Sequence, residues 1–127
     1  MGDEEAKSIM YVQTHGVDEP GKTATPFFLA AAAAAMDIEA AIYFTMNGAT
    51  LLKKGVAEEL NIKRGAGGQS LRFFMDQALE LGVRFYVCQP SLDLHDLTMD
   101  DLMEGVEMIG GAAFNSMALE ADVVISF

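Results

Sequence analysis

Cys88 is the only cysteine of the chain, and it ends an apolar run, residues 83–88, that is followed by Gln89-Pro90-Ser91. A short apolar run bounded by turn residues predicts a buried strand, and ligands of open α/β sheets bind at the carboxyl ends of strands. A thiol at such a position is a nucleophile if it is exposed and its pKa is lowered. Many unpaired cysteines are instead small, buried, unreactive side chains. The sequence leaves both interpretations of Cys88 open.

Two histidines are candidate partners of the thiol. His15 lies in a polar loop, residues 14–22, that follows the first predicted strand. An imidazolium beside a thiol stabilises the thiolate, so His15 is the candidate catalytic partner of Cys88; the alternative is a solvated histidine bonded to the backbone. His95 lies in an acidic loop and is the weaker candidate. One cysteine and two histidines make a zinc site within one chain improbable, and we expect no cofactor.

Residues with anion-binding potential follow two of the predicted strands. Gly16 and Lys22 follow the first strand, and Asn47 and Gly48 follow the second. Backbone amides at such positions can form a nest for an anion. Turn formation is the alternative role of the glycines, and no phosphate-loop or dinucleotide fingerprint is present. Binding of a small anion or nucleotide, with Cys88 serving only in packing, is therefore an alternative function.

Apolar runs alternate with helical patterns along the chain, which predicts βαβ units and a mostly parallel sheet. The expected strands are residues 7–13, 39–44, 83–88, 106–109 and 121–127. The expected helices are 23–36, 51–60, 69–81 and 111–119, with helical turns at 97–103 and a loop at 45–50. Continuous apolar strands require helices on both faces of their sheet. We predict a single domain, residues 1–127, built as a three-layer α/β sandwich around a mostly parallel five-stranded sheet.

The charge of the chain excludes some classes of partner. Its formal net charge is −11, whereas nucleic-acid binding requires clustered Lys and Arg. From Phe85 to the end there are eight acidic residues and no Lys or Arg; these acids either dock a basic partner or solvate a helix face. The longest apolar stretch, residues 26–36, is shorter than the ~20 residues that a membrane span needs. The acidic amino terminus lacks the order of a signal peptide, so we expect a cytoplasmic protein.

Small and flexible apolar residues suggest close packing. Ala30 begins a run of six alanines, which predicts a stable helix and also permits contact with a second subunit. Met99, Met103 and Phe114 are expected either in the core or on an apolar surface around the Cys88 loop or at a subunit contact. A structural subunit of an oligomer is thus a further alternative function.

The order of several segments resembles the DsrE/DsrF-like family, which includes sulfur-relay subunits. These segments are residues 14–24, which lead into the alanine-rich helix, then 43–48, 51–55, 82–88 with its terminal cysteine, 101–110, and 111–113 before the last strand. The resemblance covers nearly the whole chain. It implies an α/β fold of the DsrEFH type and assembly into homo- or hetero-oligomers, commonly trimers or hexamers.

The same resemblance implies that Cys88 carries sulfane sulfur as a persulfide. The predicted function is a small sulfur-trafficking protein that passes this sulfur to a partner thiol, with loop amides and His15 stabilising the thiolate. Some members of the family have a second cysteine, which this chain lacks. The partners are therefore separate donor and acceptor proteins with reactive thiols, and the resemblance implies no metal or organic cofactor.

Overall fold

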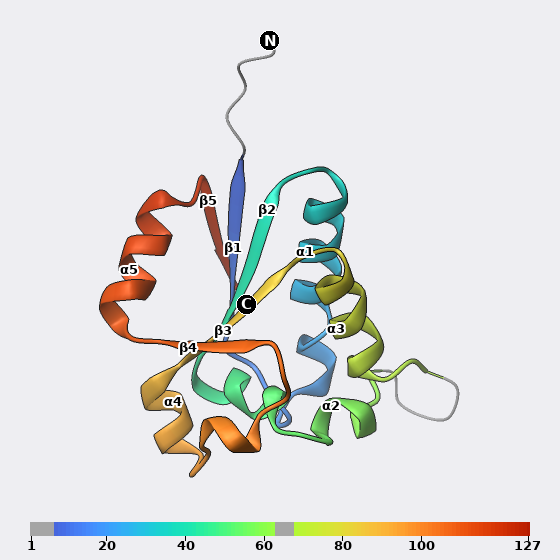
Figure 1. Cartoon of the computed structure of the whole chain (residues 1–127). Coiled ribbons are helices and arrows are strands. Elements are labelled where there is room, and N and C mark those ends of the chain that lie inside the picture. The colour runs from blue at the N-terminus through green and yellow to red at the C-terminus, as the bar shows by residue number, and fades with distance from the viewer. Residues whose placement is uncertain (1–6, 63–67) are drawn as a thin grey trace.

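A parallel five-stranded sheet forms the middle layer of the computed structural model, which describes residues 7–62 and 68–127 (Figure 1). The strands lie side by side in the order β4-β3-β2-β1-β5. They are β1 (Ser8–Gln13), β2 (Glu39–Phe44), β3 (Arg84–Cys88), β4 (Val106–Ile109) and β5 (Val123–Ser126). All four strand pairings are parallel. The predicted α/β architecture is therefore confirmed, and the largest difference in strand length is at β5, where 121–127 was expected.

Helices cover the two faces of the sheet unequally. α1 (Thr25–Ala35) and α3 (Leu71–Glu80) pack on one face, with the short α2 (Val56–Glu59) beside α3. α5 (Gly111–Glu120) lies on the other face (Figure 1). The short α4 (Gln89–Leu94) follows β3 at the carboxyl edge of the sheet. No helix in the described ranges is both long and apolar enough to cross a bilayer.

Each face of the sheet has its own core, because successive side chains of a strand point to opposite faces. Under α1 and α3, the rings of Phe27, Phe44 and Phe85 have centroids 5.3–5.7 Å apart. Under α5, the buried side chains are fewer. They are Met10, Tyr43, Tyr86 and Ile109, with Cys88, Phe114 and Met117 packed against them. Cys88 thus belongs to the α5 face.

The expected helix over 51–60 is wrong in its first half. Residues 46–52 form a 3-10 helix, η2 (Met46–Leu52), where a loop at 45–50 was expected. Lys53 then pairs with Leu102 in an isolated bridge, and Gly55 has a left-handed φ of 85°. Because other residues rarely adopt such a φ, the chain changes direction at Gly55, and only Val56–Glu59 is α-helical.

Two segments after β3 also differ from expectation. Of the helical turns predicted at 97–103, only a short 3-10 helix forms, η3 (Met99–Asp101). Its start is capped by Asp101 Oδ2, which accepts a hydrogen bond from the Thr98 amide at 2.8 Å. α4 was not predicted at all, and Pro90 occupies its first turn. Pro is compatible with that position because a first-turn amide has no partner within the helix.

Candidate functional site

Cys88 is the last residue of β3, and its side chain is only partly buried. It lies opposite Ile109 of the edge strand β4. Partial burial raises the pKa of the Cys88 thiol, but hydrogen bonds from Tyr43, Ser91 and Thr45 together lower it further. The net pKa of Cys88 is below the usual value for a thiol. A reachable thiol with a lowered pKa has the two properties that reactivity requires.

The polar groups around Cys88 come from the neighbouring strand β2, the loop after that strand, and α4. Tyr43 points to the same face of the sheet from β2, Thr45 follows that strand, and Ser91 is in the first turn of α4. Both the side chain and the backbone of Ser91 lower the pKa of Cys88. None of these three residues was chosen from the sequence. Thr45 and Ser91 could have been found as hydroxyls one and three residues after predicted strands, whereas the position of Tyr43 depends on the pairing of β2 with β3.

Ser91 also connects the loop after β2 to α4. Its Oγ accepts a bond from the Met46 amide at 2.7 Å and lies 3.3 Å from Thr45 Oγ1. The carbonyl of Met46 is also bonded, because it accepts a hydrogen bond from His95 Nε2 at 3.1 Å. Met46 has a left-handed φ of 52°. His95 therefore helps to hold a strained loop beside the site, and its ring nitrogen is engaged by backbone.

Tyr43 is a buried phenol on the α5 face of the sheet. Its side chain is 7% exposed, and burial followed by its hydrogen bond to Cys88 raises its pKa far above the usual value for a phenol. Its hydroxyl therefore stays protonated near neutral pH. A protonated phenol can donate a hydrogen bond to a thiolate, which favours the charged form of the sulfur.

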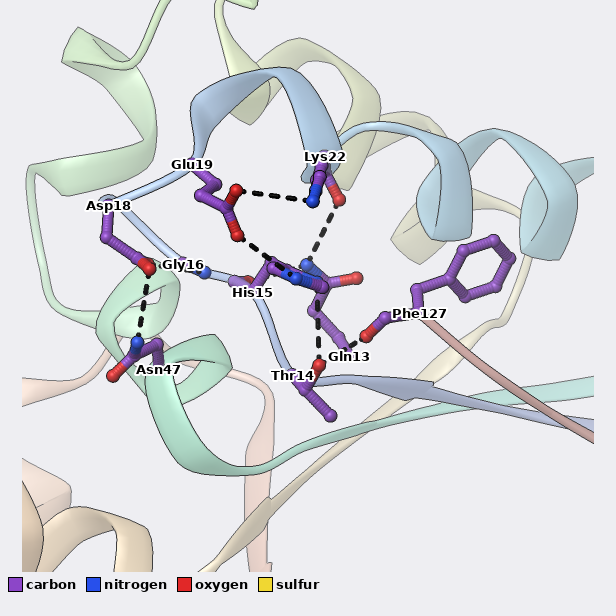
Figure 2. Close-up of polar contacts among 9 residues, drawn as sticks. All are labelled: Gln13, Thr14, His15, Gly16, Asp18, Glu19, Lys22, Asn47 and Phe127. Atoms are coloured by element: carbon purple, nitrogen blue, oxygen red, sulfur yellow. Dashed lines mark hydrogen bonds and ion pairs between the residues drawn. The ribbon is translucent and has the colours of Figure 1, made fainter.

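His15 has its polar contacts within the loop after β1, as Figure 2 shows. Its Nε2 lies 3.1 Å from Glu19 Oε2, and its Nδ1 is 3.4 Å from Thr14 Oγ1. The other oxygen of the Glu19 carboxylate is 3.2 Å from Lys22 Nζ. The polar groups found around Cys88 come from β2, its loop and α4. The structure thus brings His15 together with Glu19 and Thr14, and Cys88 together with Tyr43, Thr45 and Ser91.

Gly16 and Gly48 allow the loops after β1 and β2 to touch. A Cβ on Gly16 would be 1.9 Å from the Asn47 carbonyl oxygen, and one on Gly48 would be 2.1 Å from that of Gln13. Backbone oxygens at these distances leave no room for a side chain. Both glycines are therefore required for the close approach of the two loops.

The other residues expected to contact an anion face carboxylates. Asn47 Nδ2 donates to Asp18 Oδ2 at 3.2 Å (Figure 2), and Lys22 is paired with Glu19. An anion bound between these loops would meet both carboxylates. Close by, Gln13 is fully buried and donates through Nε2 to the His15 carbonyl at 2.6 Å, while its Oε1 has no partner among the described residues.

The methionines and Phe114 separate into different places. Met103 is 8% exposed and belongs to the core beneath α1 and α3, in the same cluster as Leu92 of α4. Met99 is 36% exposed. Phe114 packs on the α5 face with its ring 4.3 Å from that of Tyr43. Of the three residues, Phe114 is the one that lies against a donor to Cys88.

A groove of about 420 Å³ lies on the same face but at the amino-terminal edge of the sheet. Arg84, Tyr86 and Met117 are among its lining residues, and Cys88 is not. In residues 7–62 and 68–127, no three His, Cys, Asp or Glu side chains are grouped as a metal site would require.

Comparison with known proteins relates the whole described chain to one family. The sequence profile of the DsrE/DsrF-like family matches residues 7–127. The sulfur carrier protein DsrE2 of Allochromatium vinosum is 26% identical over 137 residues, which covers 79% of this chain and 86% of that protein. An uncharacterised protein of Methanocaldococcus jannaschii is 26% identical over 106 residues, covering 84% of this chain, but the match spans only 38% of that longer protein.

Solved structures show the same fold at low sequence identity. The YchN protein of E. coli superposes with a TM-score of 0.76 at 15% identity, covering 97% of this chain and 100% of that one. A protein of unknown function from Methanobacterium thermoautotrophicum gives a TM-score of 0.63 at 13% identity, with the same coverage.

Proposed function

This chain belongs to the DsrE/DsrF-like family, a sulfur-relay family, and we propose that it carries sulfane sulfur as a persulfide on Cys88. The observation that carries the proposal is the partly buried thiol at the end of β3, with three hydrogen-bond donors that lower its pKa. The name of the Allochromatium vinosum relative, a sulfur carrier protein, supports the same chemistry.

Loading and release are the same exchange run in two directions. In loading, the Cys88 thiolate attacks the outer sulfur of a donor persulfide, the donor S–S bond breaks, and the donor leaves as a thiolate. In release, an acceptor thiolate attacks the outer sulfur on Cys88, and Cys88 leaves as the thiolate. Neither direction needs an external oxidant or reductant. A lowered pKa helps both steps, because it increases the thiolate fraction and makes Cys88 a better leaving group.

The partners of this exchange must be other molecules. The chain has one cysteine, so a disulfide within it cannot release the sulfur, and a separate acceptor thiol is required. We therefore propose donor and acceptor proteins with reactive thiols as partners. We also propose the cytoplasm as the location, because a reducing compartment keeps such thiols free.

Intact-protein mass spectrometry tests the proposal. The purified protein is incubated with glutathione persulfide or a thiosulfonate and desalted, and Cys88→Ser serves as the control. We expect a mass gain of one or more sulfur atoms that is reversed by reductant and absent from Cys88→Ser. Retention of the gain in Cys88→Ser, or an unchanged wild-type mass with every donor, would contradict the proposal and favour a packing role for Cys88.

We further propose that the protein forms a homo-oligomer through α5 and β5. Val123, Val124 and Ile125 are 46%, 44% and 37% exposed in the edge strand, and α5 contains no buried residue. Exposed apolar edge strands pair readily with other chains unless Lys, Pro or a bulge protects them, and β5 has neither Lys nor Pro. The trimer or hexamer implied by the family is the expected assembly.

Light scattering on size-exclusion fractions tests this assembly. Val124→Lys should reduce the measured mass toward that of one chain. Phe28→Lys, at an apolar residue of α1 that is 65% exposed, should leave the mass unchanged. A wild-type protein that is monomeric at micromolar concentration would contradict the proposal and remove the interpretation of the protein as a structural subunit.

A further inference from the structure

We propose that Phe114 is a positioning residue for Cys88: its ring packs on Tyr43, which lies on the same face of the sheet in the strand next to that of the thiol, and keeps the phenol hydroxyl turned toward the sulfur. The proposal rests on the proposed function only in that both concern the same thiol. It assigns a role in that chemistry to α5, which covers this face of the sheet.

The contact between the two rings is direct. The centroids of Tyr43 and Phe114 are 4.3 Å apart, with 34° between the ring planes. Aromatic pairs at such distances add a favourable interaction beyond simple burial. Tyr43 is 7% exposed, and Phe114 is partly buried. The Phe114 ring therefore covers Tyr43 on the side that the sheet does not.

The start of α5 is fixed close to Cys88 by the chain itself. Ile109, the last residue of β4, lies opposite Cys88, and α5 begins two residues later. The Phe114 amide donates to the Gly110 carbonyl at 3.0 Å in the first turn of the helix. Toward the sheet, α5 turns only Phe114, Met117 and Ala118, which are its partly buried residues. Phe114 is thus the aromatic side chain that α5 places against the sheet, five residues after the strand residue that lies opposite Cys88.

Tyr43 needs such a support because its hydroxyl acts at the end of a rotatable side chain. Side chains occupy discrete rotamers, and only a conformation that aims the hydroxyl at Cys88 can hydrogen-bond to the thiolate. Without the Phe114 ring, one face of the Tyr43 ring would open to solvent and other conformations would compete. The hydrogen bond to the sulfur would then be made only part of the time.

The pH profile of Cys88 alkylation by iodoacetamide tests this role. Each rate is divided by the alkaline plateau of the same variant, so that a change in access to the thiol cancels. Phe114→Ala should slow the normalised rate at neutral pH by up to about tenfold, approaching the effect of Tyr43→Phe, since a bond to a charged group is lost. The double variant should be no slower than Tyr43→Phe alone, because both changes remove one interaction.

Three variants complete the design. Phe114→Tyr keeps the ring and should keep the wild-type profile. Met117→Ala, on the same helix but beside the distant groove, should also keep it. If Phe114→Ala is not folded by circular dichroism, Phe114→Leu retains side-chain volume without the flat ring and should shift the profile in the same direction.

A wild-type profile in Phe114→Ala or in its folded substitute, or a double variant slowed by the product of the two single effects, would overturn the proposal. Persulfide loading is measured separately by mass. A shifted profile in Phe114→Ala without sulfur loading of the wild type would reject the carrier function and leave the positioning role supported. Sulfur loading with an unshifted profile would support the carrier function and reject the positioning role.

Discussion

Replacing Ser91 by alanine should affect both the reactivity of Cys88 and the stability of the fold. Ser91 is 5% exposed, and its hydroxyl oxygen accepts the Met46 amide at 2.7 Å. The same hydroxyl is one of the groups that lower the pKa of Cys88. Ser91→Ala removes these two interactions together and leaves the backbone at position 91, which also lowers the pKa of Cys88, in place.

The two effects have different magnitudes and causes. Losing the part-buried hydrogen bond between the Met46 amide and Ser91 Oγ should cost about 0.5–1.5 kcal/mol of unfolding free energy, the usual net contribution of one hydrogen bond. For a chain of this size, that loss lowers Tm by roughly 2–6 °C. A hydrogen bond to a charged group contributes about 1.5 kcal/mol at the low end of its range. We use this low value because the Cys88 thiol is partly exposed to solvent. At pH values below the titration midpoint of Cys88, the fraction of thiolate should therefore fall about tenfold.

Alkylation by iodoacetamide measures the thiolate directly, because Cys88 is the only cysteine and each chain takes one label. Rates are followed from about pH 5 to pH 10, and thermal unfolding is followed by circular dichroism. Ser8→Ala is the matched control: its hydroxyl accepts the Asp122 amide at 3.3 Å near the opposite edge of the sheet, so the Cys88 profile should be unchanged. A wild-type alkylation midpoint in Ser91→Ala would refute the assignment of Ser91 as a donor to the sulfur.

Two further predictions concern the packing of the loops and the phenol. Gly48→Ala should destabilise the fold by about 1–3 kcal/mol, measured by urea unfolding, because the added Cβ would be 2.1 Å from the Gln13 carbonyl oxygen. Gly21→Ala is the control and should be nearly neutral, because its added Cβ would have nothing within 4 Å. Equal stabilities of the two variants would contradict the close approach of the loops. Burial raises the pKa of Tyr43 above its usual 10.0, so its contribution to stability is complete below pH 10 and is lost as the pH rises beyond it. The difference in unfolding free energy between wild type and Tyr43→Phe should therefore fall above pH 10, and a difference independent of pH would count against burial of that phenol.

The layers of the fold could be predicted from the sequence because strands and helices leave strong local patterns. β2 and β4 begin and end at the predicted residues, 39–44 and 106–109. Their apolar runs are bounded by polar or glycine residues, and such runs in alternation with helices indicate a parallel sheet. Local segments that depend on tertiary contacts were less predictable. The helix expected over 51–60 is interrupted because Lys53 pairs with Leu102, a residue far away in the sequence.

The candidate site could be predicted only in part for the same reason. Cys88 was identified because its position at the end of a strand is a local property. Tyr43 becomes a donor only through the parallel register of β2 with β3, and the sequence does not encode that register in any short motif. His15 is near the same edge of the sheet, but its contacts are set by Glu19, four residues further along its own loop.

Transfer of sulfur from the loaded protein to a second thiol is the most direct test of whether Cys88 is a sulfur carrier. The protein is loaded, desalted and mixed with reduced glutathione, and both species are followed by mass spectrometry over time. We predict that the protein loses the mass of each sulfur it had gained. Glutathione persulfide, together with the oxidised glutathione and sulfide that excess glutathione forms from it, should appear in equal total amount. Ser91→Ala, loaded to the same extent, should transfer more slowly because Cys88 is then a poorer leaving thiolate. A loaded protein that keeps its sulfur in the presence of excess glutathione would contradict the claim that Cys88 is a carrier.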